Sequence, residues 1–359
     1  MKVAIITDSI TNTGGAERVI LEQAKYFNAD VYVALYSPGT TFKEFSKLNI
    51  KKIMNVKLPN KIRTIYLWHI FASLKLKKKY DFYIFHGAGA INASKKLKPN
   101  VWYCHSPSRY LYDLYKHEMQ QHKGLSRILY KIVTRVQRII DQKNVRFIDQ
   151  IFVNSKNVEK RVLKYYGRKS KIVYPSVNTK KFKFLGQKDY YLSTARLDRI
   201  KRVDLVIKAF KKMPNKKLII ISDGPDKSKL HKLASGASNI KFLGRVSDEK
   251  LATLYGNCIA TLYLSYKEDF GIIPLESMAA GKPCIATNDG GFQETIKHDK
   301  TGFLIDNPED ISNVINAVNY VTSKKATSMK QECIKTAEKF SLKSFIKEHI
   351  KTINELTHS

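Results

Sequence analysis

The sequence lacks any run of about 20 consecutive apolar residues, the length that a membrane-spanning helix needs. Its first residues, MKVAIITDSI, hold too short an apolar run for a secretory signal, and no small-residue cleavage pattern follows. The sequence has neither a short-period repeat nor a low-complexity segment. These absences exclude solenoid and fibrous classes, and we expect a globular protein without a spanning helix.

Cysteine is scarce, and the four thiols follow no recognisable pattern. Cys104, Cys258, Cys284 and Cys333 have the spacing of neither a zinc site nor a disulfide framework. The first three lie in apolar, strand-like runs, where buried thiols are common. We therefore expect a protein of a reducing, cytoplasmic compartment.

Acidic residues are half as frequent as basic ones, with 31 Asp and Glu against 64 Lys and Arg and a net charge of +33. The excess lies between residues 51 and 250, and the last hundred residues are nearly neutral. A basic surface attracts nucleic acid, anionic lipid or nucleoside diphosphates. A lysine-rich composition bias explains the same numbers, so charge alone does not choose a partner.

Strand-like apolar runs alternate with helix-like segments, a pattern typical of parallel α/β sheets. We expect strands at 3–7, 30–37, 81–87, 101–105, 150–155, 190–196, 217–224, 240–244, 258–265, 283–288 and 302–305. At 359 residues the chain is long for one domain, and the pattern restarts after a linker near 175–188. Two doubly wound domains are therefore predicted, at 1–175 and 185–340, with a helix at 341–356 that packs back on the first.

Residues 124–148 predict a strongly amphipathic helix. Its apolar positions are Leu125, Ile128, Leu129, Ile132, Val133, Val136, Ile139 and Ile140, and its basic positions are Arg127, Lys131, Arg135 and Arg138. The simplest interpretation docks the apolar face on the first domain's sheet. A second interpretation adds that the basic side, or nearby loops, meets anionic lipid.

In doubly wound sheets, ligands bind beyond the carboxyl ends of the strands, so motifs there matter most. Gly14 and Gly15 follow the first strand where a helix begins, and glycines there let an anion approach the backbone, although a plain turn fits as well. His105 ends the 101–105 strand and is predicted to donate to a sugar hydroxyl, to assist proton movement, or to be structural. Arg109 and Asp113 follow; they contact an acceptor or pair with each other.

In the second half, cations and carboxylates occupy the corresponding strand ends. Arg196 ends a strand and Lys201 precedes a helix, which suits a diphosphate whose charge must be neutralised, whereas two solvated cations are the alternative. The turn at 222–230 shapes the same pocket, and Val246 lies where a nucleobase could rest.

The strongest motif is EDFGIIPLE, in which Glu268 and Glu276 are eight residues apart. The backbone of Phe270, Gly271 and Ile272 opens a helix, where N–H groups can meet donor oxygens. Glu276 would accept both ribose hydroxyls and Glu268 would bind sugar hydroxyls, with their charge offset by the cations.

From GGAERV through His105 and the Arg196–Lys201 pair to Gly290-Gly291, the chain resembles retaining glycosyltransferases with the GT-B fold, in particular glycosyltransferase family 4. The resemblance implies two Rossmann-like domains facing across a cleft, the first binding the acceptor and the second a nucleotide sugar. It implies that Gly15 approaches the donor diphosphate, and that His105 contacts the donor sugar.

The resemblance also implies catalysis without a metal or other cofactor, and the sequence has no Asp-x-Asp motif. The family often has Gly-Gly-x-Pro-Glu where this chain has Gly290-Gly291-Phe292-Gln293-Glu294, so Glu294 carries little weight. CHSPSRYLYD is similar to members that transfer mannose or related sugars during surface polysaccharide assembly. We therefore expect a GDP- or UDP-hexose donor, mannose favoured, and a saccharide or lipid-linked acceptor.

Two alternatives remain open. A sugar-nucleotide epimerase would use the nucleotide pocket without an acceptor, but the Glu268–Glu276 motif argues against it. Nucleic-acid binding is suggested by charge alone, and no zinc-finger or RNA-binding signature supports it. The basic region 51–146, including Lys75, Lys77, Lys78 and Lys79, predicts salt-sensitive binding to an anionic membrane at its inner face.

Overall fold

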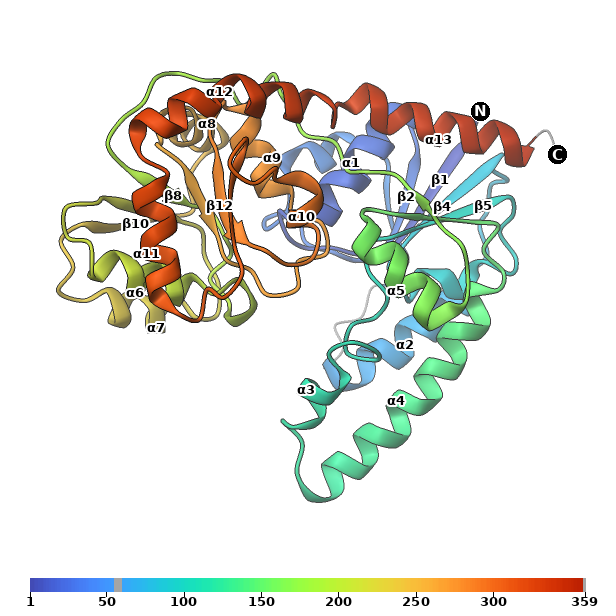
Figure 1. Cartoon of the computed structure of the whole chain (residues 1–359). Helices are drawn as coiled ribbons and strands as arrows, with labels where there is room; N and C mark the ends of the chain where they lie inside the picture. The colour runs from blue at the N-terminus through green and yellow to red at the C-terminus, as the bar shows by residue number, and fades with distance from the viewer. Residues whose placement is uncertain (55–59, 358–359) are drawn as a thin grey trace. The chain divides into compact units, whose positions relative to one another are not determined.

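The computed structural model describes residues 1–54 and 60–357 of the chain. It divides into two compact units, of which unit 1 comprises Met1–Pro175 with Phe345–Ser359 and unit 2 comprises Ser176–Ser344. Each unit is a parallel sheet with helices (Figure 1). None of the helices within the described residues is long and apolar enough to cross a membrane.

Unit 1 is built on seven parallel strands. They are β1 (Val3–Ile10), β2 (Asp30–Tyr36), β3 (Ile50–Lys52), β4 (Phe82–His86), β5 (Asn100–Cys104), β6 (Gln150–Val153) and β7 (Lys171–Ile172), in the order β3-β2-β1-β4-β5-β6-β7. Its helices are α1 (Gly15–Phe27), η1 (Lys43–Lys47), α2 (Asn60–Ala72), η2 (Ala90–Ala93), α3 (Tyr115–Met119), α4 (Gly124–Val145), α5 (Lys156–Tyr166) and α13 (Leu342–Thr357).

Side chains alternate across this sheet, so both of its faces are buried. Val3 and Ile5 belong to a core that includes residues of α1 and α13, whereas Ala4 and Ile6 belong to a second core with residues of α2 and α5. The near-continuous apolar strands that the sequence shows follow from this double coverage.

Unit 2 holds six parallel strands. They are β8 (Tyr191–Ser193), β9 (Leu218–Ile221), β10 (Ile240–Gly244), β11 (Thr261–Tyr263), β12 (Cys284–Thr287) and β13 (Gly302–Ile305), in the order β10-β9-β8-β11-β12-β13. Its helices are η3 (Arg199–Lys201), α6 (Val203–Lys211), α7 (Lys227–Ala234), α8 (Asp248–Asn257), α9 (Ile272–Ala279), α10 (Phe292–Thr295), α11 (Ile311–Tyr320) and α12 (Ser323–Glu338).

The orientation expected for the amphipathic helix is wrong. In α4 the apolar side chains are the exposed ones, with Ile132 57% and Leu125 81% exposed, and the buried side includes Gln137 and Asp141. The reason is that α4 meets polar groups of the preceding loop, since Tyr112 donates a hydrogen bond to the Asp141 carboxylate. The helix therefore does not dock its apolar face on the sheet.

Candidate active site

In unit 2 the predicted polar residues lie beyond the carboxyl ends of neighbouring strands. The segment 194–201 follows β8, the segment 264–271 follows β11, and the segment 288–291 follows β12. Because β8, β11 and β12 are adjacent and parallel, their carboxyl ends share one edge of the sheet.

Lys201 and Glu268 form an ion pair at this edge. The Nζ and Oε2 atoms are 2.7 Å apart, and the side chains are only 22% and 16% exposed. Burial alone would lower the pKa of Lys201, but Tyr263 and the Glu268 carboxylate hold that pKa above its ordinary value. The ammonium also lies 5.2 Å from the centre of the Tyr263 ring. Lys201 is therefore a positioned, fully charged cation.

Arg196 lies in the same turn as Lys201, and Asp198 links the two. Asp198 caps η3 by accepting a hydrogen bond from the Lys201 backbone N–H, 3.1 Å away, and its other oxygen is 3.8 Å from Arg196 Nε. The Arg196 side chain is 59% exposed. The turn thus presents one solvated guanidinium beside one buried ammonium.

Glu276 lies one turn into α9 and is almost fully buried. Its Oε2 accepts a hydrogen bond of 2.9 Å from the Tyr255 hydroxyl, and that hydroxyl is also 2.9 Å from Thr194 Oγ1. Thr194 directly follows β8, so the phenol ties the α9 carboxylate to the segment that carries Arg196. Glu276, Arg196 and Lys201 therefore belong to one connected arrangement.

The loop between the two glutamates is held by the glycine pair. Gly291 N–H donates to Glu268 O over 3.0 Å, and a Cβ at Gly290 would lie 2.2 Å from that oxygen. A Cβ at Gly291 would lie 2.3 Å from Phe270 Cα. The pair is needed because the loop backbone lies directly against it.

Of the other residues of unit 2 predicted to contact the donor, residues 270–272 lie at the start of α9 and Val246 lies farther along the sheet edge. Gly271 has φ +80° and precedes Ile272, the first residue of α9, and Phe270 is buried beside Phe340. Val246 follows β10, at the same carboxyl edge but two strands away from β8, and is half-buried.

Gly14 and Gly15 lie at the start of α1 in unit 1, as the sequence predicted. Gly14 is the residue that precedes the helix and Gly15 is its first residue. The buried carboxylate of Glu17 accepts hydrogen bonds from the backbone of Asn12, Gly14 and Thr11, and burial raises its pKa. A carboxyl group of the protein thus already accepts from these N–H groups, a feature that the sequence did not predict.

His105 ends a chain of hydrogen bonds that begins on α13. His349 Nδ1 lies 2.9 Å from the carbonyl oxygen of Phe345, which can only accept, so Nδ1 carries the proton of this ring. The other nitrogen of the ring, His349 Nε2, therefore accepts from the Gln23 amide nitrogen at 2.7 Å. The Gln23 oxygen then accepts from His86 Nε2 at 2.6 Å, and His86 Nδ1 accepts from His105 Nε2 at 3.0 Å.

This direction fixes the tautomer of His105. Its proton is on Nε2 and is donated to His86, which leaves the lone pair on Nδ1. Burial lowers the pKa of both His105 and His349 to about 4, so the rings are neutral near pH 7. The Nε2 proton is thus committed within the protein, and Nδ1 is the acceptor.

The alternative reading of Arg109 and Asp113 as partners is confirmed. Arg109 Nη2 and Asp113 Oδ2 are 3.0 Å apart, and Arg161 lies 3.9 Å from the same oxygen. The sequence reading missed Tyr255 and Tyr263, because tyrosines in apolar runs have the signature of core residues.

Two family descriptions match almost the whole chain between them. Residues 13–181 match "Glycosyltransferase Family 4", and residues 176–340 match "Glycosyl transferases group 1". The chain belongs to the group 1, family 4 glycosyltransferases. It is a nucleotide-sugar-dependent glycosyltransferase. Its two Rossmann-like halves have the GT-B fold.

Some relatives match along almost the whole chain at low identity. The chain is 26% identical to an alpha-1,3/1,6-mannosyltransferase, ALG2, of Dictyostelium discoideum, over 96% of each protein. Its fold is similar to that of Anabaena Alr3699/HepE in complex with UDP and glucose, with a TM-score of 0.76 at 18% identity over 99% and 100% of the chains. It is also similar to sucrose-phosphate synthase of Thermosynechococcus elongatus, with a TM-score of 0.77 at 16% identity over 99% of each.

Proposed function

We propose that this glycosyltransferase moves a hexose, with mannose favoured, from a GDP- or UDP-sugar to a saccharide or lipid-linked acceptor, with retention of configuration. The observation that carries the proposal is the connected arrangement of Arg196, Lys201, Glu268 and Glu276 at the carboxyl edge of unit 2. Mannose is supported by the names of the mannosyltransferase relatives. A UDP donor is the alternative, because the structure of Anabaena HepE contains UDP.

Each charged group has a role that follows from its chemistry. Arg196 and Lys201 bind the diphosphate, Glu276 accepts the two ribose hydroxyls, and Glu268 accepts from hydroxyls of the sugar. The backbone N–H groups of Phe270, Gly271 and Ile272 lie at the start of α9 and donate to oxygens of the nucleotide sugar.

The reaction then needs charge stabilisation and positioning more than a dedicated base. The acceptor oxygen forms a bond to the anomeric carbon on the face that the diphosphate leaves. The bond from that carbon to the diphosphate breaks, and the departing phosphate oxygen takes the acceptor proton. Lys201 and Arg196 stabilise the charge that develops on the leaving group, so no metal ion or other cofactor is required.

His105 has a defined part in this proposal. Because its Nε2 proton is donated to His86, a contact with the donor sugar uses Nδ1 as acceptor of a hydroxyl proton. This replaces the expectation that His105 donates to the sugar. The proposal gives Gly14 and Gly15 a supporting place beside the diphosphate, and Val246 a place against the nucleobase.

The proposed acceptor is carried at the inner face of a membrane. Lys75, Lys77, Lys78 and Lys79 are exposed in unit 1, in the most basic part of the chain. Residues 55–59 of the predicted basic region lie outside the described residues. Cations clustered in this way attract anionic lipid headgroups, whereas this proposal includes no nucleic-acid partner.

A donor panel tests the proposal. Thermal unfolding is measured with GDP-, UDP- and ADP-sugars, and the true donor raises the melting temperature by mass action. Lys201→Ala is expected to slow transfer, because the leaving diphosphate loses its buried cation. Product analysis by NMR should show the donor's anomeric configuration; inversion, or full activity of the Lys201 variant, would contradict the proposal.

A further inference from the structure

One helix of unit 1 exposes a continuous apolar surface, which we name the α4 stripe. Its members are all at least half-exposed: Leu125, Ile128, Leu129, Ile132, Val136 and Ile139. At 100° per residue these positions fall within a sector of about 100° on one side of the helix. Isolated exposed apolar residues are ordinary, but six on one helix face form a patch that calls for a partner.

The side opposite the stripe is polar and buried, so the helix is held by its hydrophilic face. Asp141 accepts hydrogen bonds from the hydroxyls of Tyr112 and Tyr166, each 2.8 Å long, and Arg138 donates to Leu111 O. Rotating α4 to hide its stripe would break these bonds and leave the buried polar groups without partners. The exposure of the stripe is therefore built into the fold.

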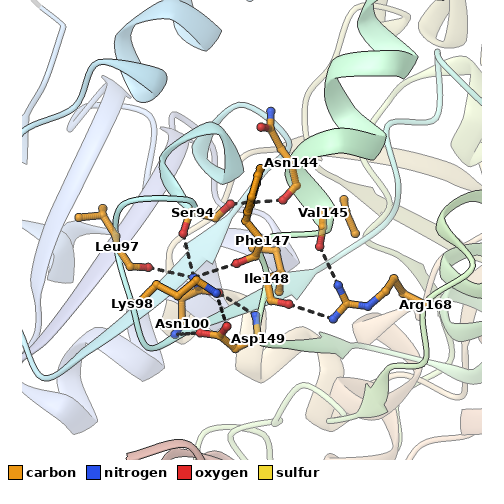
Figure 2. A network of polar contacts seen from close by, with 10 residues as sticks. All are labelled: Ser94, Leu97, Lys98, Asn100, Asn144, Val145, Phe147, Ile148, Asp149 and Arg168. Atoms are coloured by element: carbon orange, nitrogen blue, oxygen red, sulfur yellow. Dashed lines mark hydrogen bonds and ion pairs between the residues drawn. The ribbon is translucent and has the colours of Figure 1, made fainter.

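The carboxyl end of α4 is also fixed (Figure 2). Arg168 donates to Val145 O and to Ile148 O, both over 2.9 Å, and the Ser94 hydroxyl donates to Asn144 O. Asn100 then ties this corner to the start of β5, through its hydrogen bond to Phe147 O. The stripe is thus presented on a rigid support.

The charges on α4 select the chemistry of the partner. The helix contains five Lys and Arg residues and a single acidic residue, the buried Asp141. Lys131 and Arg135 are exposed beside one edge of the stripe, whereas the exposed Arg127 lies about 100° farther round the helix. In a dimer formed through this face, the cations of one copy would repel the same cations of the other, whereas anionic lipid headgroups would neutralise them.

We propose that the α4 stripe is a membrane-docking surface, which lies flat in the interface of an anionic bilayer. The apolar side chains enter the boundary between headgroups and acyl chains, and the cations along the edge contact lipid phosphates. This deepens the membrane part of the proposed function, because it names the surface and the helix face. It adds the apolar face to the expectation that the basic side or nearby loops meet lipid, and it does not depend on which sugar is transferred.

The test compares matched variants of the full chain on lipid vesicles. Sedimentation with phosphatidylglycerol–phosphatidylcholine vesicles is measured for the wild type and for the double variant Ile128→Ser, Ile132→Ser. The matched control is Leu163→Ser, Leu185→Ser, because these leucines are equally exposed, at 57% and 58%, away from the stripe. We expect at least a tenfold weaker partition for the α4 variant and no change for the control.

A charge variant separates the two contributions. Lys131→Gln, Arg135→Gln should weaken binding to the anionic vesicles and reduce its dependence on salt. Equal partition of the α4 double variant and the wild type would overturn the proposal. A wild-type dimer in light scattering that becomes a monomer in the double variant would also overturn it, in favour of a second copy.

Donor-induced thermal stabilisation is recorded for the same proteins. It should be unchanged in the α4 variant, because the stripe and the Lys201–Glu268 pair lie in different units. Vesicle binding through α4 without any donor response would leave this inference standing and remove the proposed donor. If a donor stabilises the protein but the α4 substitutions leave vesicle binding unchanged, the proposed donor stands and this inference is overturned.

Discussion

At the scale of single residues, the two glutamates of the site in unit 2 are oriented by a hydrogen bond and an ion pair within the protein. The Tyr255 hydroxyl bridges Glu276 and Thr194, and the Glu268 carboxylate is paired with Lys201. Such partners fix where each carboxylate oxygen points before a ligand arrives, which lowers the entropic cost of binding.

Tyr255→Phe removes one hydroxyl from this arrangement. A net hydrogen bond contributes about 1 kcal/mol, and more when the acceptor is charged, so donor affinity should fall about fivefold or more. Calorimetric titration of the donor measures it. The matched control is Tyr191→Phe, whose hydroxyl donates to Val318 O and Val321 O instead. Equal affinity losses in both variants would show that Tyr255 has no special bearing on the donor.

The tautomer of His105 is a second prediction at this scale. Long-range proton–nitrogen NMR on labelled protein should show a neutral ring, protonated on Nε2, throughout the range from pH 6 to pH 8. Gln23→Leu breaks the chain between His349 and His86, so the variant should show mixed tautomers at His86. An Nδ1–H signal for His105 in the wild type would contradict the direction of the chain.

The sequence predicted where these charged residues lie better than it predicted the residues that support them. Glu268, Glu276 and Lys201 were found because charged groups at strand ends are informative. Tyr255 and His86 were missed, because buried aromatic residues in apolar segments look like core until their polar atoms are placed. The hydrogen-bond partner of a tyrosine comes from a distant segment, 21 residues away for Glu276.

At the scale of elements, the glycine pair 290–291 shapes the loop between the glutamates. Gly290→Ala would place a Cβ 2.2 Å from Glu268 O at a φ of +61°. The loop must move, so we expect both a lower melting temperature and a donor affinity reduced at least tenfold. Gly236→Ala is the control, because its φ is +78° but nothing lies within 4 Å of its Cβ.

Backbone strain alone is common to both glycine variants. The control should therefore lose stability by about 1 kcal/mol without changing donor affinity. Unaltered donor affinity in Gly290→Ala would show that the position of Glu268 does not matter for binding.

Apolar runs identified the long central strands, but two edge strands escaped. β3 has the sequence IKK and β7 has KI, which are too short and too basic to resemble strands. The prediction of which face of α4 is buried was wrong, because periodicity separates an apolar from a polar face but does not show which face packs on the protein. The buried face is set by Tyr112 of the preceding loop, which lies outside the helix sequence.

At the scale of the whole molecule, the two units should respond differently to acid. Burial lowers the pKa of His105 and His349 to about 4 and that of His86 well below its ordinary value, and all three lie in unit 1. The unfolded rings bind protons from pH 6.5 downward while the folded rings do not. Their contribution to stability is therefore complete above pH 6.5 and is lost as the pH falls toward 4.

Buried carboxyls of unit 1 act in the opposite direction. Burial raises the pKa of Asp8 and Asp141 to about 6 and also raises that of Glu17, so these groups favour the folded state as the pH falls. At pH 5 the low pKa values of His105 and His349 each destabilise the folded state by about 2 kcal/mol, whereas the raised pKa values of Asp8 and Asp141 each stabilise it by about 1 kcal/mol; His86 acts in the same direction as the other two imidazoles. The imidazoles therefore dominate.

Hydrogen exchange resolved by residue tests this difference. Amides of β4 and β5 should lose protection between pH 7 and pH 5, after correction for intrinsic exchange, and those of β11 and β12 should not. A uniform loss in both units would show that the buried histidines are not responsible. The restart of the α/β pattern near residue 185 predicted two sheets from sequence, but not that pH sensitivity would be confined to one.

The central claim is that the carboxyl edge of unit 2 binds a nucleotide sugar through two cations and two carboxylates. A crystal structure of the protein with bound GDP or UDP tests it most directly. The account predicts the diphosphate against Arg196 and Lys201 and the ribose hydroxyls within hydrogen-bond distance of Glu276. A nucleotide bound elsewhere, with the Glu276–Tyr255 hydrogen bond unchanged, would contradict it.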